Sequence, residues 1–379
     1  MRNHAARLLS FERIEIDVTR LVLSGVALAL PVAIGAAGGH LAEGLTATMG
    51  ALLISAAGHE GGWRARLTDL GASAAVGALT VWLGALIGRN SIAAGFWIVA
   101  VAFGAALAGG IGTLEGRIAA NATVFTVIGA HLGTGPDSPG HILLFLALGM
   151  LAGAALILGT YGVSRLMSPL WRRGLDGPPS PDWPFRRSVQ KWRAGLRTMR
   201  GWRYPLRLGT AMAAAETVSH FRPGAHTYWI ALTVSLVVLR DEAASPVRAV
   251  ERALGTMIGV LLGGLLLGVL PTWGMVALIG AIGAVRPYLK VANYTAYAAV
   301  MTPLITMLNE LGQDMSWAVL RERVLDTLLG CVIGLGVGYL LWRTVPRVWR
   351  KLRPRRAAAV PEAEDTEARS APSPSTPAR

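Results

Sequence analysis

The sequence is poor in charged residues and in cysteine, and both shortages narrow the class of protein. Only 15% of its 379 residues are charged, whereas a soluble globular chain usually carries about 25%. The single cysteine, Cys331, lies inside an apolar block and cannot form an internal disulfide. We therefore expect it to act as a small apolar side chain, and we expect neither a soluble nor a disulfide-stabilised domain.

The sequence also lacks the motifs that carry common enzyme chemistry. No lysine follows a glycine, which excludes a GxxxxGK[ST] phosphate-binding loop, and no Gly-x-Ser-x-Gly elbow is present. No Cys/His cluster has the spacing of a metal site. We therefore predict a chain that is not an enzyme and that needs no metal or cofactor.

What the sequence has in abundance is hydrophobic residues, 53% of the chain, gathered in long blocks. A helix that spans a bilayer needs roughly 20 mostly apolar residues. This predicts an all-α integral membrane protein with about twelve transmembrane helices in contact with the lipid bilayer. The candidate spans are 20–38, 45–57, 70–88, 92–111, 118–133, 141–163, 206–220, 228–239, 254–270, 273–285, 293–308 and 325–342.

The basic residues predict how these spans are oriented. If the N-terminus is cytoplasmic and twelve spans alternate, 32 of the 36 Lys and Arg residues fall on the cytoplasmic side. This is the bias that orients membrane proteins, so we expect both termini in the cytoplasm. The high net charge of +14 does not predict a nucleic-acid partner, because the basic residues flank apolar blocks. We expect an uncleaved first helix, since three acidic residues precede it.

The two halves of the chain resemble each other, which predicts four regions. Residues 1–165 and 206–342 would each form a six-helix membrane repeat, joined by a basic cytoplasmic linker at 166–205 and followed by a disordered cytoplasmic tail at 343–379. Because each half has an even number of spans, the repeats would be parallel. The matched positions are Leu45-Thr46 with Leu232-Thr233, Arg64 with Arg248, Gly71 with Gly255, Asn121 with Asn293, and Gly149 and Gly153 with Gly330 and Gly334.

Glycines recur at four-residue spacing in two of the expected spans. This spacing lets two helix backbones approach closely, so tight packing is the favoured interpretation and a sliding seam the alternative. The candidate packing residues are Gly255, Gly259, Gly263, Gly330, Gly334 and Gly338.

Polar residues near the start of the ninth span could bind an anion. Ser245 and Pro246 favour a helix start, and Arg248 and Arg252 lie four residues apart on one face. The free N–H groups and positive dipole of a helix start would add to their attraction for an anion. The alternative is that both arginines only anchor the helix, with Glu251 as a local partner.

Three further polar positions fall within expected spans. Glu216 could bind a proton or gate substrate, or it could simply be hydrated near the outer surface. Thr295 and Thr302 fall near one face of a span broken by Pro303 and could line a cavity. Threonines at such positions can also bond their own helix.

The motif around these residues resembles one known family. Tyr228-Trp229-Ile-Ala-Leu232-Thr233, followed by Arg248, Arg252-Ala-Leu-Gly255-Thr256 and Gly259, is similar to the fusaric acid resistance protein-like family, also called the aromatic acid exporters. The likeness covers roughly 204–342 and is weaker over 17–165. It implies a bacterial inner-membrane, multi-pass protein, and it adds Tyr228 and Trp229 to Arg248, Arg252, Thr295 and Thr302 as candidate substrate-binding residues. The sequence departs from the family pattern in two ways. Many members have a large cytoplasmic domain, whereas this chain has only the linker at 166–205, and the Arg240-Asp241-Glu242 turn is more charged than expected.

The resemblance implies efflux of a small organic anion, and two alternatives stay open. The first hypothesis is a secondary transporter that exports aromatic carboxylic acids, with Glu216 as the candidate for proton coupling. The second is a passive organic anion channel. The third is a non-transporting membrane scaffold that acts through its basic linker and tail. The partners expected besides lipid and substrate are a second copy of the chain or a periplasmic adaptor.

Overall fold

The structure is a computed structural model that describes residues 11, 18–55, 57, 62–167, 185–222, 224, 226–267, 269–310 and 317–344. Within these ranges all the long elements of regular structure are helices, and no strand occurs. The expected all-α class is therefore confirmed. Nearly all of the predicted C-terminal tail lies outside the described residues.

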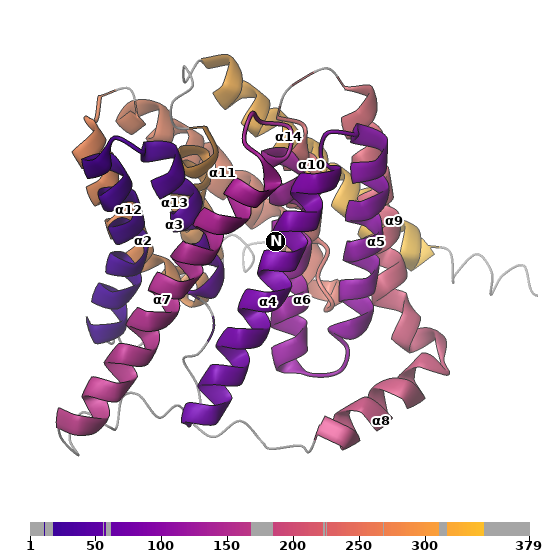
Figure 1. Cartoon of the computed structure of the whole chain (residues 1–379). Helices are drawn as coiled ribbons and strands as arrows, with labels where there is room; N and C mark the ends of the chain where they lie inside the picture. Colours follow the sequence, from indigo (N-terminus) through magenta and orange to yellow (C-terminus); the bar gives the residue numbers. More distant parts are fainter. Residues whose placement is uncertain are drawn as a thin grey trace, which may run out of the picture.

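The described part of the first half of the chain contains six packed helices. They are α2 (Val18–Gly38), α3 (Leu41–Ile54), α4 (Trp63–Ile87), α5 (Ser91–Ala108), α6 (Thr113–Leu132) and α7 (Pro139–Met167). A further helix, α8 (Phe185–Leu196), lies in the segment predicted only as a basic linker. Figure 1 shows α8 at one end of the bundle, outside the packed helices.

The described part of the second half also contains six long helices, together with two short helical segments. They are α9 (Met199–Phe221), α10 (Tyr228–Val237), α11 (Ser245–Leu267), α12 (Thr272–Ala292), α13 (Tyr294–Glu310) and α14 (Trp317–Leu335). A 3-10 turn, η2 (Glu242–Ala244), precedes α11, and a π-helix, η3 (Gly336–Leu341), continues α14. Each of the twelve predicted spans overlaps one of these twelve helices, and the last span also covers η3.

Seven helices in the described chain are long and apolar enough to cross a membrane: α2, α4, α5, α7, α11, α12 and α14. Three others, α3, α10 and α13, are apolar but shorter. With its ten residues, α10 is about 15 Å long, roughly half of a bilayer core. The chain is thus a multi-pass membrane protein, and the number of twelve crossings remains a prediction.

Several helices extend beyond the predicted spans, and charged residues explain why. The ninth span was predicted from 254, whereas α11 starts at Ser245; the twelfth was predicted from 325, whereas α14 starts at Trp317. The tenth was predicted to end at 285, yet α12 continues through Arg286 to Ala292. Hydropathy detects only the apolar part of a helix, but arginines at its ends keep the helical conformation.

Side-chain caps fix two of the helix starts. The amide oxygen of Asn90 accepts a hydrogen bond from Ala93 N–H at 3.1 Å, and that of Asn293 accepts one from Ala296 N–H at 3.0 Å. Asn and Asp are favoured at this position because they satisfy a free backbone N–H. Asn293 therefore separates α12 from α13 and serves as a helix cap.

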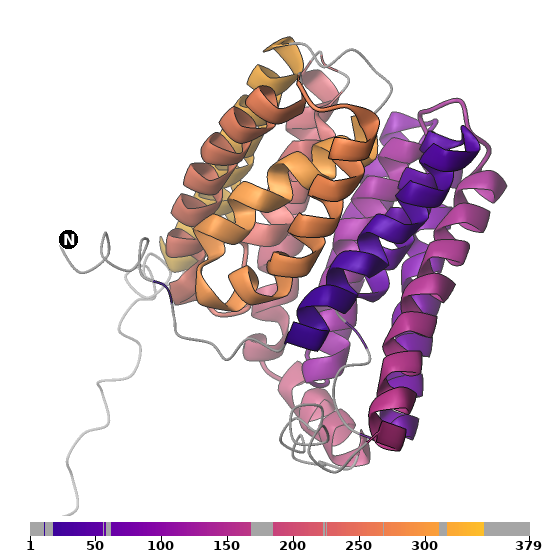
Figure 2. The ribbon, with the colours of Figure 1, turned by 90° about the vertical axis from the view of Figure 1, so that its left-hand side faces the viewer.

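Helices of the same rank pack on the same partners in each half. The second helix packs on the sixth (α3 on α7, α10 on α14), and the third packs on the fifth (α4 on α6, α11 on α13). The halves meet through two matching contacts, α2 with α12 and α5 with α9, each joining a first helix to a fourth. Figure 2 shows the second half, from pink to yellow, beside the first half, from indigo to magenta.

The outward faces of the bundle are apolar, as a lipid-facing surface requires. On α7 the exposed large side chains Leu144, Leu148 and Leu151 follow helical spacing, and Val22, Val26 and Leu30 do so on α2. The inner helices α3 and α10 are mostly buried. The hydrophobic core therefore lies around these short helices, between the two halves.

Candidate functional site

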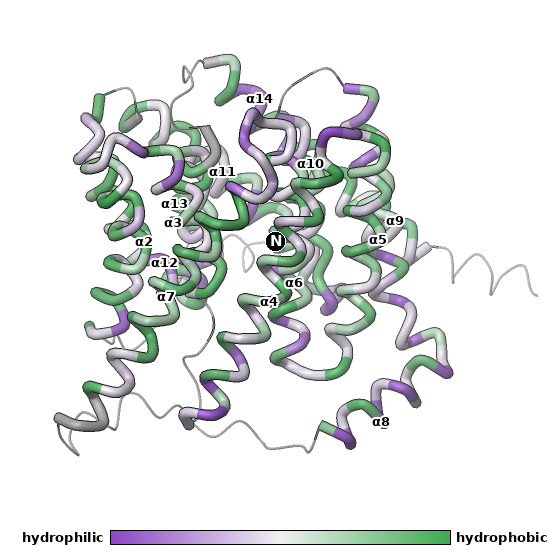
Figure 3. The backbone as a smooth tube through the Cα atoms, in the orientation of Figure 1, coloured by the Kyte–Doolittle hydropathy of each residue, from purple (hydrophilic) through white to green (hydrophobic). Residues whose placement is uncertain are grey.

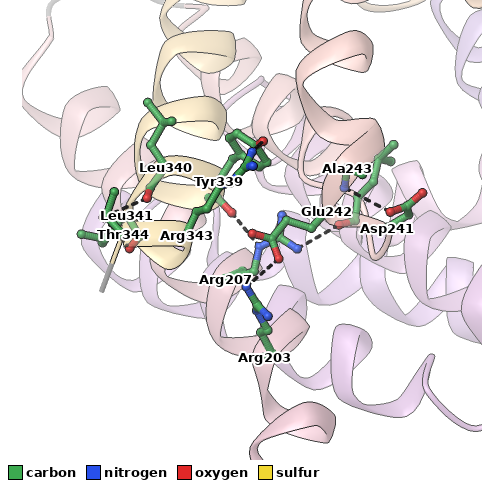
Figure 4. Close-up of polar contacts among 12 residues, drawn as sticks. Arg203, Arg207, Asp241, Glu242, Ala243, Tyr339, Leu340, Leu341, Arg343 and Thr344 are labelled. Carbon is green, nitrogen blue, oxygen red and sulfur yellow. Dashed lines mark hydrogen bonds and ion pairs between the residues drawn. The ribbon is translucent and has the colours of Figure 1, made fainter. Parts of the chain in front are cut away.

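The turn between α10 and α11 is tied to three helices at one end of the bundle. Arg207 of α9 donates from Nε to the carbonyl of Gly338 at 2.7 Å and from Nη1 to that of Leu239 at 3.4 Å. Gly338 lies in the π-helix η3, whose wider turn displaces carbonyls from the regular helical pattern. Arg203 forms an ion pair with Glu242 at 2.8 Å (Figure 4). These contacts hold the charged turn that the sequence marked as unusual.

Two further side chains of this turn fix the start of α11. Asp241 accepts a hydrogen bond from Ala243 N–H at 3.1 Å, and the buried Ser245 hydroxyl accepts one from Leu239 N–H at 3.1 Å. Arg240 reaches across to the first half, where it donates to the carbonyl of Ala106 at 2.7 Å. The end of α10 and the start of α11 are thereby fixed relative to α5.

Arg248, one turn into α11, already has partners. Its guanidinium carbon lies 3.5 Å from the ring centroid of Tyr294 on α13, and its Nε lies 3.8 Å from a carboxylate oxygen of Glu251. The distance to Glu251 is at the long end for an ion pair, whereas the stack on Tyr294 is close. Glu251, the local partner expected if Arg248 only anchors the helix, is therefore beside it.

Arg252, one turn further along, is in a different environment. It is only 4% exposed, and the described residues offer it no carboxylate within ion-pair distance. Its Nε is buried without a hydrogen-bond partner in the described part of the chain. Burying a charged guanidinium without an acidic partner costs free energy. An anion that bound to it and neutralised the charge would therefore bind favourably.

A second buried arginine, Arg286 on α12, faces the same region and was missed from the sequence. It is 9% exposed and donates a hydrogen bond to the hydroxyl of Ser55, which follows α3 in the first half. Hydropathy placed Arg286 in a loop, and only the continuation of α12 shows it to be inside the bundle. Arg248, Arg252 and Arg286 all lie close enough to Tyr297 for their charges to act on its hydroxyl.

Other polar groups add to this basic end of the bundle. Lys290 lies near Arg117, Arg248 and Arg286. The hydroxyls of Thr256 and Thr295 are buried, and neither has a hydrogen-bond partner among the described residues. We name Arg248, Arg252, Arg286, Tyr297, Thr256 and Thr295 the arginine cluster. It offers donors and positive charge with little compensating acid, so it can bind a carboxylate.

The remaining candidate on α13, Thr302, is already bonded within its own helix, as is Thr306 one turn further along. The Thr302 hydroxyl donates to the carbonyl of Ala298 at 2.9 Å, and that of Thr306 donates to the carbonyl of Thr302 at 2.9 Å. Thr295 and Thr302 therefore differ, since only Thr295 retains an unused buried hydroxyl in the described structure.

Tyr228 and Trp229 lie at the start of α10, whereas Arg248 and the start of α11 follow its end. Tyr228 stacks on His131 of α6 with ring centroids 3.8 Å apart, and the guanidinium of Arg323 lies 2.9 Å from the centroid of Trp229. His226 lies 3.3 Å from a carboxylate oxygen of Glu322. The structure thus separates the sequence-predicted binding residues into two groups, one at each end of α10.

Glu216 lines a cavity at the junction of α5 and α9, on the side of the bundle. The cavity has a volume of about 370 Å³, and an added Cβ at Gly95 would lie 3.5 Å from the Glu216 carboxylate. Phe96 and Phe221 on its rim are 76% and 79% exposed. No ion-pair partner for Glu216 occurs among the described residues. At the matching junction, Ala29 takes the equivalent place, and an added Cβ at Gly280 would lie 3.1 Å from its side chain.

The candidate packing glycines lie in helix contacts. An added Cβ at Gly259 would lie 2.4 Å from the carbonyl of Ala299, and one at Gly255 would lie 2.6 Å from that of Thr295, both on α13. An added Cβ at Gly330, Gly334 or Gly338 would lie 2.6 Å from Thr233, 3.1 Å from Val237 and 2.6 Å from Val238, respectively, in α10 or at its end. Gly263 is buried. Gly71, paired with Gly255 by the repeat, has nothing within 4 Å, so this pair of positions differs in its packing.

The comparisons with known proteins agree with the resemblance seen in the sequence. Residues 210–337 match the family described as fusaric acid resistance protein-like. This part of the chain is therefore similar to that family, and the chain is a multi-pass membrane protein.

The individual relatives also have the names of membrane proteins. The chain is 30% identical over 176 residues to the "Uncharacterized membrane protein YvaC" of Bacillus subtilis, and 27% identical over 154 residues to the "Inner membrane protein YccS" of Escherichia coli. These matches cover 45% and 38% of this chain but only 27% and 21% of those proteins. No solved structure matches the chain.

Proposed function

We propose that the protein is a secondary transporter that exports organic anions, most suitably aromatic carboxylates, across a bacterial inner membrane. The observation that carries this proposal is the buried guanidinium of Arg252, for which the described residues supply no acid. Together with Arg286 it forms a place where a carboxylate would be held by charge-assisted hydrogen bonds. Tyr294 and Tyr297 nearby offer aromatic faces for a substrate ring.

The path would run between the halves, along the short helices. Short helices at matching positions of two repeats are a mark of transporter binding sites, and α3 and α10 are the second helices of their halves. We propose that residues 1–165 and 206–342 are parallel repeats related by an axis along the membrane normal. The repeated packing of α3 on α7 and α10 on α14 supports this.

The basic end would face the cytoplasm, because Lys and Arg concentrate on that side of membrane proteins. An anion would be gathered there by the arginine cluster and released at the other end. Release would require the Tyr228 and His131 rings to separate, since their stack joins the two halves. Glu216, at a junction between the halves, would couple this movement to proton binding.

The decisive experiment is a flux assay with the full chain in liposomes. A panel of aromatic and aliphatic carboxylates would be loaded on one side, with and without an imposed pH gradient. Uphill movement driven by the pH gradient would support a secondary transporter. Flux that follows only the anion's own electrochemical gradient would favour a channel, and no flux for any anion would favour a scaffold.

A further inference from the structure

The helix α8 has the sequence pattern of a membrane-surface helix. Its apolar residues Phe185, Val189, Trp192 and Leu196 recur at helical spacing, and its other face is basic. No Asp or Glu occurs anywhere from 185 to 207. Figure 3 shows the resulting alternation of hydrophobic and hydrophilic residues along α8.

Tryptophans attach this helix to the end of the bundle. Trp192 donates from its indole N–H to the carbonyl of Leu107 at the end of α5, at 2.9 Å. Trp202 of α9 donates to the carbonyl of Leu196 at 2.8 Å. Indole rings favour the headgroup level of a bilayer, so these contacts place α8 at the depth of the lipid headgroups.

A basic cavity lies between α8 and the end of α5. Its volume is about 420 Å³. The polar side chains in its lining are Ser188, Lys191, Trp192 and Arg240, and none of the described lining residues is acidic. An added Cβ at Gly110 would lie 3.1 Å from the Trp192 ring and 3.4 Å from Nη1 of Arg240, so the glycine leaves this space open.

We propose that this cavity binds the phosphate headgroup of an anionic phospholipid. Lys191 and Arg240 supply the charge, Ser188 supplies a hydroxyl, and the apolar stripe of α8 lies along the adjacent acyl chains. A membrane lipid is the natural occupant because α8 is at headgroup depth and a basic segment there attracts anionic lipids. The proposal is independent of whether the chain transports anions.

Native mass spectrometry of the full chain in detergent tests the proposal. The probes are phosphatidylglycerol, phosphatidylcholine and inorganic phosphate. We expect the parent to bind phosphatidylglycerol at least about fivefold more tightly than phosphatidylcholine, and Lys191→Glu to remove most of that preference. Gly110→Leu should remove it as well, because it fills the cavity without changing the charge.

The matched control is Arg193→Glu, which makes the same charge change on α8 at a position that does not line the cavity. It should retain most of the preference for phosphatidylglycerol. Equal binding of both lipids by the parent would overturn the proposal, as would an equal loss in Arg193→Glu and Lys191→Glu, which indicates diffuse attraction. Equally tight binding of inorganic phosphate would show a free-anion site and would also overturn it.

Discussion

The guanidinium of Arg286, on α12, donates a hydrogen bond to the hydroxyl of Ser55, which follows α3 in the other half of the chain. The arginine cluster is therefore tied to both halves. An anion bound there would respond to any movement of one half against the other. This would suit the proposed transporter, in which one half of the chain moves against the other.

Arg252→Met should separate function from stability. Methionine fills a similar volume without charge, and replacing a buried, unneutralised guanidinium by an apolar side chain is often neutral or stabilising by about 1–4 kcal/mol. We expect an equal or higher Tm in detergent and a loss of carboxylate flux of at least about tenfold. A clear fall in Tm with flux retained would show that Arg252 serves the fold and not the substrate.

Lysine substitutions distinguish the two arginines of α11. Lysine keeps the charge but loses the planar fork that binds a carboxylate through two hydrogen bonds. Because Arg248 already stacks on Tyr294 and Arg252 has no acidic partner among the described residues, Arg252→Lys should lower the initial export rate more than Arg248→Lys does. Rates are normalised to protein in the membrane. If both variants match the parent, the arginines are only positive-inside anchors.

Gly259→Leu should destabilise the contact between α11 and α13. Even a Cβ at this position would lie 2.4 Å from a backbone carbonyl, so the helices must move apart, at a cost of about 1–3 kcal/mol or more. We expect a lower Tm in detergent. Gly104→Leu on α5 is the control, because nothing lies within 4 Å of its Cβ position. The same Tm in both variants would contradict close packing at Gly259.

Glu216→Gln tests the coupling of export to protons. Glutamine keeps the size of the side chain and cannot take up or release the proton. We expect pH-driven uphill export to be lost while the protein stays folded and downhill flux remains. Thr217→Val, in the lining of the same cavity, should keep full coupling. Normal pH-driven export by the Gln variant would leave Glu216 as a hydrated surface carboxylate.

The predicted orientation can be tested with single cysteines in a Cys331→Ala background. Ser180 and Ser370, which lie outside the described residues, should resist impermeant thiol reagents in intact cells because both are predicted to be cytoplasmic. Ser91, exposed at the opposite end of the bundle, should react in its cysteine variant. Strong labelling at Ser180 or Ser370 would reverse or break the predicted topology.

The sequence by itself determined the class of the protein and the approximate place of each helix. Long apolar blocks with few charges predict membrane helices because hydropathy and length are local properties of the chain. The motif from Tyr228 to Gly259 was also local, and the family resemblance that it carried is confirmed.

Only the tertiary structure decided which side chains meet. Arg286 looks like a loop residue in the sequence, and its burial and its bond to Ser55 depend on α12 packing beside the first half. Tyr228 and Arg248 stand in one motif, yet α10 separates them, since Tyr228 begins this helix and Arg248 follows its end. Glu216 came to lie at a junction because α5 packs on α9. Contacts between helices depend on faces brought together across long stretches of chain, and no local pattern specifies them.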